Sequence, residues 1–113
     1  MIGLDTSFLV AFEIAEHPRH RAARDFASAR CAEGLAIAPQ VLAEFCHVTT
    51  DPARFTQPLS MSEAIRAVTR WWRAREVTVI DAGKAAGERC LALLEEHELG
   101  RKRLLDTMLV ATY

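Results

Sequence analysis

The chain begins with the stretch MIGLDTSFLVAF at residues 1–12, and this stretch sets the expected fold class. Ile2 to Leu4 is an apolar run that is too short for a helix and is typical of a buried strand. The apolar residues from Phe8 onward recur with a helical period. Asp5 therefore lies where a strand ends and a helix begins, which is where open α/β sheets bind their ligands.

Strand-like and helix-like segments alternate along the rest of the chain. Further short apolar runs occupy residues 35–38 and 77–80. This alternation predicts an α/β sandwich with a parallel sheet. Helical patterns fill the intervals: one follows Pro18, one begins at Pro39, one is capped by Ser60 or Ser62, one covers residues 83–99 and stops at Gly100, and one runs from about Leu105 to Tyr113.

The bulk properties of the chain limit the protein classes to consider. A length of 113 residues leaves room for one domain, so we expect a single domain over residues 1–113. Lys and Arg number 14 against 15 Asp and Glu, so no global charge attracts nucleic acid. The 3 cysteines lack disulfide or zinc-site spacing and predict buried thiols in a reducing compartment. No segment resembles a membrane span or a leader, and we expect a cytoplasmic protein without a membrane partner.

Three carboxylates stand in apolar surroundings, where an ionised group is costly unless it is paired or bound to a cation. Glu44 interrupts an apolar helical stripe between Val41 and Val48. Asp106 follows two leucines at the start of the last predicted helix. Together with Asp5, these residues predict a divalent-metal site.

Each of these residues also has a structural interpretation. Asp5 would serve as a helix N-cap, and Glu44 as a rim residue or the partner of a buried arginine. Asp106 would complement the dipole of the last helix. Thr6 and Ser7 either orient Asp5 through their hydroxyls or act as ordinary capping residues. The residues alone leave both interpretations open.

Three segments carry a resemblance to a known family: residues 1–10, 39–45 and 105–112. In order and spacing they resemble the PIN-domain family, and within it the VapC-type toxins of bacterial toxin–antitoxin pairs. The segment over residues 50–59 is similar to a loop of that subgroup. Each motif alone is weakly specific, but together they extend over nearly the whole chain. The resemblance implies a three-layer α/β/α fold with a parallel sheet.

The resemblance also implies an activity and its partners. It predicts a metal-dependent endoribonuclease, the toxin of a type II toxin–antitoxin system, which hydrolyses RNA phosphodiester bonds with Mg²⁺ or Mn²⁺. Asp5, Glu44 and Asp106 would be the catalytic metal ligands, with Thr6 and Ser7 supporting them. The implied partners are an RNA substrate, a cognate antitoxin protein and a second copy of the chain.

The chain departs from the family pattern at its end. Family members continue beyond the last helix into further strands, which supply a fourth acidic or polar residue, whereas this sequence ends at Tyr113. Asp81 does not match the position of that fourth residue. We therefore expect a PIN-like domain that is incomplete at its C-terminus and whose first strand has an unpaired edge. Such an edge predicts lower stability or self-association.

A second function hypothesis is a catalytically impaired PIN-like protein that serves as an antitoxin-binding or dimerisation module. A groove for such a partner would be lined by aromatic residues of the helices, although core packing is the favoured interpretation of these side chains. The histidines show no convincing metal-ligand pairing and are interpreted as structural. The aromatic residues concerned are Phe8, Phe12, Phe26, Trp71 and Trp72.

Overall fold

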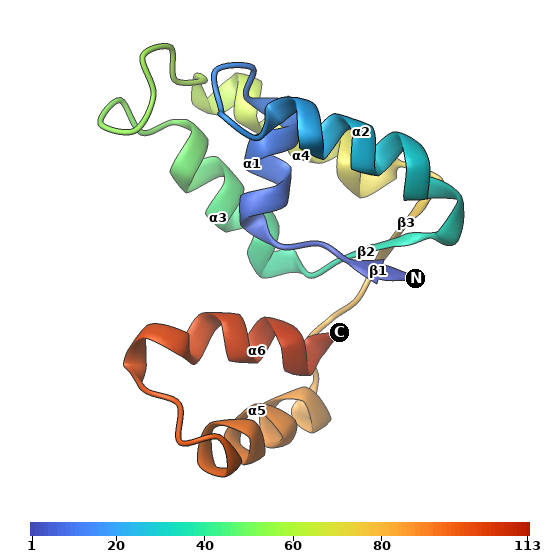
Figure 1. The fold of residues 1–113 in the computed structure, drawn as a ribbon, viewed down its shortest axis with the longest axis vertical. Helices are drawn as coiled ribbons and strands as arrows, with labels where there is room; N and C mark the ends of the chain where they lie inside the picture. The colour runs from blue at the N-terminus through green and yellow to red at the C-terminus, as the bar shows by residue number, and fades with distance from the viewer. The chain divides into compact units, whose positions relative to one another are not determined.

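The computed structural model describes all of residues 1–113, shown in Figure 1. The chain divides into two compact units, Met1–Val79 and Ile80–Tyr113. The first unit contains every strand and four α-helices, and the second unit contains two α-helices. No helix is both long enough and apolar enough to cross a membrane.

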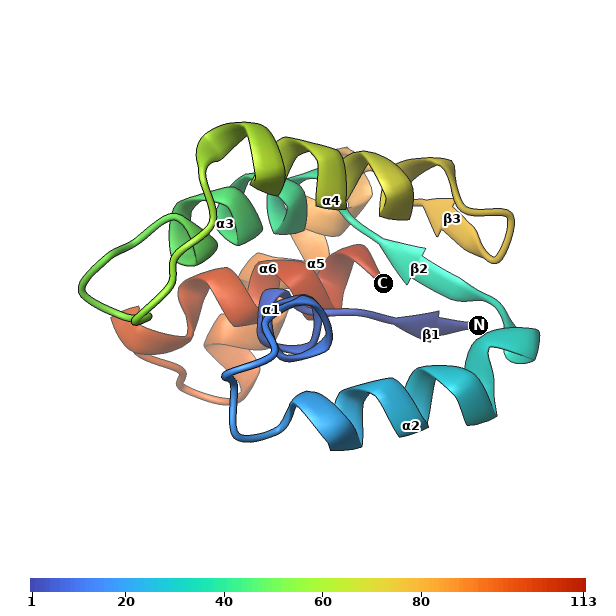
Figure 2. The same ribbon diagram turned by 90° about the horizontal axis from the view of Figure 1, so that it is seen from above.

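The first unit is built on a sheet of three short strands, β1 (Ile2–Gly3), β2 (Leu35–Ile37) and β3 (Val77–Val79). Both strand pairs are parallel, and β2 lies between β1 and β3 (Figure 2). Parallel neighbours need crossover connections, which the helices provide. The predicted α/β class with a parallel sheet is confirmed, as are the positions of the strands.

The helices of the first unit begin where local sequence signals place them. Helix α3 (Pro39–Thr49) has Pro39 in its first turn, and α4 (Met61–Arg73) is capped by Ser60 in a reciprocal capping box with Glu63. Helix α1 (Thr6–Glu13) follows β1 directly, and α2 (His20–Arg30) continues into the short 3₁₀ helix η1 (Cys31–Glu33). The centre of the core is formed by fully buried Leu9, Ile37, Val41 and Phe45.

The aromatic residues divide between the core and the surface. Phe8, Phe12 and Trp71 form a cluster in which the Phe12 and Trp71 ring centroids are 5.0 Å apart. Phe26 joins the cluster through Phe8 but is 37% exposed, and Trp72 is 43% exposed. The expectation of core packing is wrong for Trp72, because successive helical residues point to different faces and Trp71 takes the inward one.

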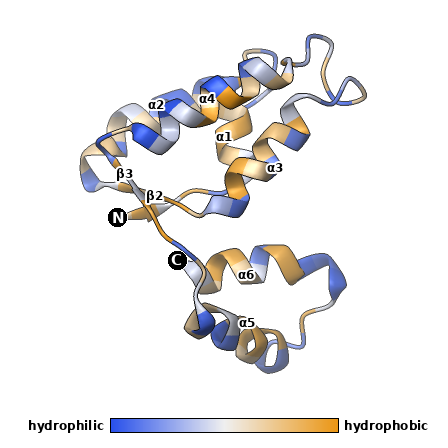
Figure 3. Ribbon diagram, turned by 180° about the vertical axis from the view of Figure 1, so that it is seen from behind, coloured by the Kyte–Doolittle hydropathy of each residue, from blue (hydrophilic) through white to orange (hydrophobic).

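The second unit is a helical hairpin of α5 (Lys84–Glu96) and α6 (Leu104–Thr112), joined through the 3₁₀ helix η2 (Arg101–Arg103). In Figure 3 the colour changes from polar at η2 to apolar along α6. The predicted stop of α5 at Gly100 is wrong. The helix ends at Glu96, and Glu98 takes the left-handed conformation at φ 51° while the amide of Leu99 donates to the Leu94 carbonyl oxygen. This is a Schellman turn with a glutamate in the position that glycine usually holds.

Candidate functional site

Asp5 lies at the carboxyl end of β1 and caps α1. Its Oδ1 atom accepts a hydrogen bond from the backbone amide of Phe8 at 2.8 Å, and the side chain is exposed. The other carboxylate oxygen, Oδ2, has no hydrogen-bond partner in the protein. Capping therefore uses one oxygen and leaves the second available for a ligand. The two interpretations of Asp5 are compatible.

Glu44 lies in the second turn of α3 and is half-buried. Its Oε2 atom accepts a hydrogen bond from the Thr6 hydroxyl at 3.0 Å, which joins α3 to the first residue of α1. No arginine pairs with Glu44, so the interpretation as a partner of a buried arginine is wrong. Because Thr6 directly follows Asp5, this bond holds the Glu44 carboxylate at the end of α1 that Asp5 caps.

The two hydroxyl residues after Asp5 differ in their roles. Thr6 does not orient Asp5 through its hydroxyl, since that hydroxyl donates to Glu44 instead. Ser7 is exposed and its hydroxyl forms no hydrogen bond within the protein. Thr6 thus fixes the position of one candidate ligand, and Ser7 presents a free hydroxyl beside it.

Asp106 lies in the second unit, in the first turn of α6, and its side chain is exposed. It lines a cavity of about 290 Å³ together with His97, Arg103 and Thr107. The Thr107 hydroxyl donates to the Arg103 carbonyl oxygen at 2.6 Å and so is not available to Asp106. The assignment of Asp106 as a ligand alongside Asp5 and Glu44 stays a prediction.

The donor atoms of the first unit suit a hard divalent cation. Glu44 uses Oε2 for Thr6, and so it offers one free carboxylate oxygen, as Asp5 does. Within neither unit do three or more His, Cys, Asp or Glu side chains gather closely enough to hold a metal ion. Mg²⁺ is commonly held by one or two carboxylates, with water and substrate phosphate completing its coordination. The oxygens of Asp5 and Glu44 therefore fit Mg²⁺ or Mn²⁺ as a partial ligand set.

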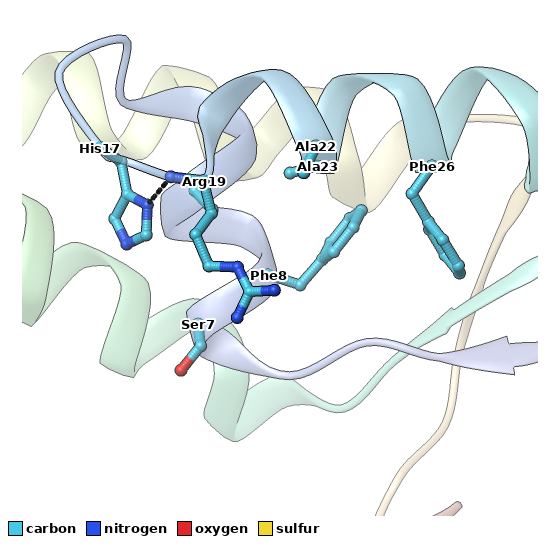
Figure 4. Close-up of a pocket in the computed structure, with 8 residues that line it drawn as sticks. Ser7, Phe8, His17, Arg19, Ala22, Ala23 and Phe26 are labelled. Atoms are coloured by element: carbon cyan, nitrogen blue, oxygen red, sulfur yellow. Dashed lines mark hydrogen bonds between the residues drawn. The ribbon is translucent and has the colours of Figure 1, made fainter.

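A cavity of about 370 Å³, here named the α1 cavity, lies between α1 and α2 and is bordered by Ser7 and Phe8. Figure 4 shows Arg19 extending from the N-terminal end of α2 toward Ser7. The Arg19 guanidinium forms no ion pair, so its charge is uncompensated within the protein. His17 accepts the backbone amide of Arg19 at its Nδ1 atom, at 3.0 Å (Figure 4).

A second cavity, of about 350 Å³, borders the same end of α1 and is here named the Phe55 cleft. Its walls come from α1, the turn before α2, the end of α3 and the loop after α3. Apart from Thr6 and Ser7, the sequence pattern did not identify these residues as functional, because none is an acid in an apolar context. The signals for this region are the turn-forming segment from Asp51 to Phe55 and the resemblance of residues 50–59 to a loop of the VapC subgroup. The lining includes Thr6, Ser7, His17, Val48, Arg54 and Phe55.

The cysteines form no disulfide. Cys90 is buried, whereas Cys31 and Cys46 are half-buried, so the expectation of buried thiols holds fully for Cys90 only. Burial raises the pKa of the Cys46 thiol above its ordinary value. The thiolate is the reactive form of cysteine, so this shift does not favour Cys46 as a nucleophile.

Comparison with known proteins gives a family and similar solved structures. The family model described as PIN domain matches residues 2–113. The crystal structure of VapC20 from Mycobacterium tuberculosis, described as a sarcin-ricin loop cleaving toxin, is similar with a TM-score of 0.74 and 21% sequence identity. The similarity covers 98% of this chain and 79% of that toxin, and shows a shared fold. No curated protein matches the chain. The resemblance carried by the three sequence motifs is thus confirmed.

Proposed function

The chain belongs to the PIN-domain family, and from this premise we propose that it is a metal-dependent endoribonuclease, the toxin of a type II toxin–antitoxin system. Relatives in this family are nucleases. The single observation that carries the proposal is the pairing of Thr6 with Glu44, which holds a half-buried carboxylate beside the strand-end acid Asp5. Two acids with free oxygens at the carboxyl end of a parallel sheet match the usual location of ligand sites in such folds.

Each residue of the first unit has a proposed role in the reaction. Asp5 and Glu44 would hold the ion through the oxygens that the protein leaves free, and Thr6 keeps Glu44 in place. Ser7 would donate its hydroxyl to a substrate oxygen or a water. A bound Mg²⁺ or Mn²⁺ would lower the pKa of a water molecule and stabilise charge on the phosphate under attack. Asp106 is proposed as the third acidic ligand, supplied by the second unit.

The proposed partners follow from membership of the PIN-domain family. The antitoxin would be the protein partner, and RNA the substrate. A second copy of the chain is proposed as a further partner, because β1 is an edge strand of the sheet. Light scattering after size-exclusion chromatography tests this last point. A mass that stays monomeric at every concentration would rule out the homodimer.

The test of the proposed activity is cleavage of a structured RNA by the purified chain with Mn²⁺ or Mg²⁺. Asp5→Asn should abolish cleavage, because an amide is a poor ligand for a hard cation. Asp25→Asn is the matched control: Asp25 is an exposed aspartate of α2 paired with Arg21. It should retain full activity. Equal cleavage by the Asp5→Asn variant and the parent would reject the mechanism.

The third ligand needs its own pair of variants. Asp106→Asn should reduce cleavage strongly, whereas Asp81→Asn, in the exposed segment after β3, should not. Metal titration by calorimetry gives a second measurement that does not depend on turnover. Unchanged metal affinity and unchanged cleavage in the Asp106→Asn variant would remove Asp106 from the site.

The second candidate function is a catalytically impaired PIN-like module that binds the antitoxin or a second copy. The observation that favours it is the edge position of β1, which leaves a strand edge open for pairing with another chain. If the module hypothesis is correct, neither the parent nor Asp5→Asn should cleave RNA, and both should bind the antitoxin with equal affinity. Cleavage that depends on Asp5 would reject it.

A further inference from the structure

The Phe55 cleft shares Thr6 with the candidate metal site. Thr6 lines the cleft, and its hydroxyl donates to Glu44. Ser7, whose hydroxyl is free, lines both the Phe55 cleft and the α1 cavity. A molecule bound in the cleft would therefore contact Thr6 and Ser7, the two residues that directly follow Asp5. At about 350 Å³, the cleft is within the size range of small-ligand pockets.

The loop that carries one wall of the cleft is held by several hydrogen bonds. Asp51 accepts the amide of Ala53 at 2.8 Å, and its other oxygen pairs with the Arg54 Nε atom at 3.4 Å. The two carboxylate oxygens of Glu16 each accept a loop amide, from Thr56 and Gln57, both at 3.2 Å. The loop is fixed at its start by Asp51 and farther along by Glu16. The backbone of the loop is therefore held before any ligand binds.

Phe55 lies in the loop after α3, whereas the other phenylalanines lie in helices. It is half-buried and takes no part in the aromatic cluster of Phe8, Phe12, Phe26 and Trp71. It lines the cleft instead. An aromatic ring outside the core, at the edge of a cavity, offers a surface on which a flat ring can stack.

The polar side chains that line the cleft offer hydrogen-bond donors and include no carboxylate. The Arg54 side chain is 58% exposed and uses Nε for Asp51, so its terminal nitrogens are free. His17 accepts a backbone amide at Nδ1, which places the proton of the neutral ring on Nε2 as a donor. Ser7 adds a hydroxyl. A planar apolar surface next to a cation and N–H donors is the recognition pattern of a nucleotide, with its flat base and anionic phosphate.

We propose that the Phe55 cleft binds one unpaired nucleotide of the RNA substrate, with the base on Phe55 and the adjoining phosphate within reach of Arg54 and His17. The proposal rests on the proposed ribonuclease function and specifies how its substrate is held. The cleft would seat a nucleotide next to the scissile phosphate, since it shares Thr6 and Ser7 with the carboxylate site. The cleft would then favour RNA that has an unpaired nucleotide at this position, because a base inside a double helix cannot stack on a protein side chain.

The test measures binding without cleavage. The Asp5→Asn chain is titrated with fluorescein-labelled oligoadenylate in Mg²⁺, and anisotropy reports the dissociation constant. Phe55→Leu, made in the Asp5→Asn chain, keeps an apolar side chain but removes the ring, and should weaken RNA binding about tenfold. Phe55→Trp, made in the same chain, should bind RNA within about twofold of the Asp5→Asn chain. A purely structural role of Phe55 would be satisfied by leucine, so this pair separates stacking from packing.

The charge contribution has its own control. Arg54→Gln should weaken binding and reduce the slope of log affinity against log salt by about 0.7, the value for one phosphate contact on a single strand. Arg21→Gln removes the same charge from a 92% exposed side chain of α2 and should leave the salt slope unchanged. Circular dichroism of each variant confirms that the chain is folded.

The outcomes separate this proposal from the ribonuclease proposal. If Asp5→Asn abolishes cleavage but Phe55→Leu and Arg54→Gln bind RNA as the parent does, the cleft proposal is wrong and the ribonuclease stands. If no variant cleaves, yet Phe55→Leu loses binding and Phe55→Trp regains it, the cleft binds RNA and the ribonuclease assignment fails. Equal salt slopes for Arg54→Gln and Arg21→Gln would remove Arg54 from the proposed contact.

Discussion

The hydroxyl of Thr6 donates a hydrogen bond to the carboxylate of Glu44 at 3.0 Å, across 38 residues of sequence. Glu44 occupies an apolar stripe of α3, and a half-buried carboxylate without a partner would destabilise the fold. Thr6 supplies that partner from the first turn of α1. The bond therefore both stabilises the packing of α1 on α3 and keeps a candidate metal ligand in one orientation.

Thr6→Val should separate these two roles. Valine keeps the shape of threonine but cannot donate, so we expect a loss of about 1 kcal/mol in the free energy of unfolding. We also expect metal affinity to fall by roughly 10- to 100-fold, because loss of a group that hydrogen-bonds to a metal ligand has an effect of that size. Thr69→Val is the control, since the Thr69 hydroxyl bonds the Ile65 carbonyl oxygen within α4. Denaturant unfolding and calorimetry are the measurements. Equal metal affinity of the Thr6→Val and Thr69→Val variants would contradict the proposal that Thr6 positions Glu44 for metal binding.

Asp5 variants should separate capping from ligation. Asparagine and aspartate cap helices about equally well, so Asp5→Asn should change the unfolding free energy by less than about 0.5 kcal/mol while removing metal binding. Asp5→Ala also removes the acceptor for the Phe8 amide, so it should lower the free energy of unfolding by about 1 kcal/mol more than Asp5→Asn does. Thermal melts with and without Mn²⁺ measure both effects. If Mn²⁺ still raises the melting temperature of Asp5→Asn, Asp5 is not a ligand.

The start of α4 should lose stability in acid. Hydrogen bonds from the Ser60 amide and hydroxyl lower the pKa of Glu63 below its ordinary value of 4.5. A lowered pKa in the folded state means that the stabilisation is present above about pH 4.5 and is lost as the pH falls through the lower folded value. Glu63→Gln should remove this part of the pH dependence. NMR titration of the Glu63 side chain gives the pKa directly, and a value at or above 4.5 would contradict the expectation.

Glu16 should control the order of the loop after α3. Glu16→Ala removes the acceptors of the Thr56 and Gln57 amides, so both amides should exchange with solvent faster while amides of the β2 strand do not. Glu16→Gln retains one acceptor oxygen and should have an intermediate effect. Hydrogen exchange followed by NMR measures each amide separately. Unchanged exchange at both loop amides in Glu16→Ala would show that other contacts order the loop.

The sequence by itself determined the features that depend on neighbours a few residues apart. The strand before Asp5, the first turn at Pro39 and a serine cap at Ser60 or Ser62 were all predictable, because each rests on the conformational preferences and hydrogen bonds of one short segment. The family membership was predictable for the same reason, since its motifs are local. The role of the three acids as a common site was a prediction from chemistry, and for Asp106 it stays one.

The tertiary structure decided the features that join distant segments. Thr6 was expected to support Asp5 but bonds Glu44, and Glu16 holds a loop that begins far from it in sequence. Glu98 rather than Gly100 adopts the left-handed turn after α5. In each case the choice among alternative partners depends on which groups the fold brings within hydrogen-bond distance. A sequence pattern lists the donors and acceptors, but only the packing of the helices selects the pairs.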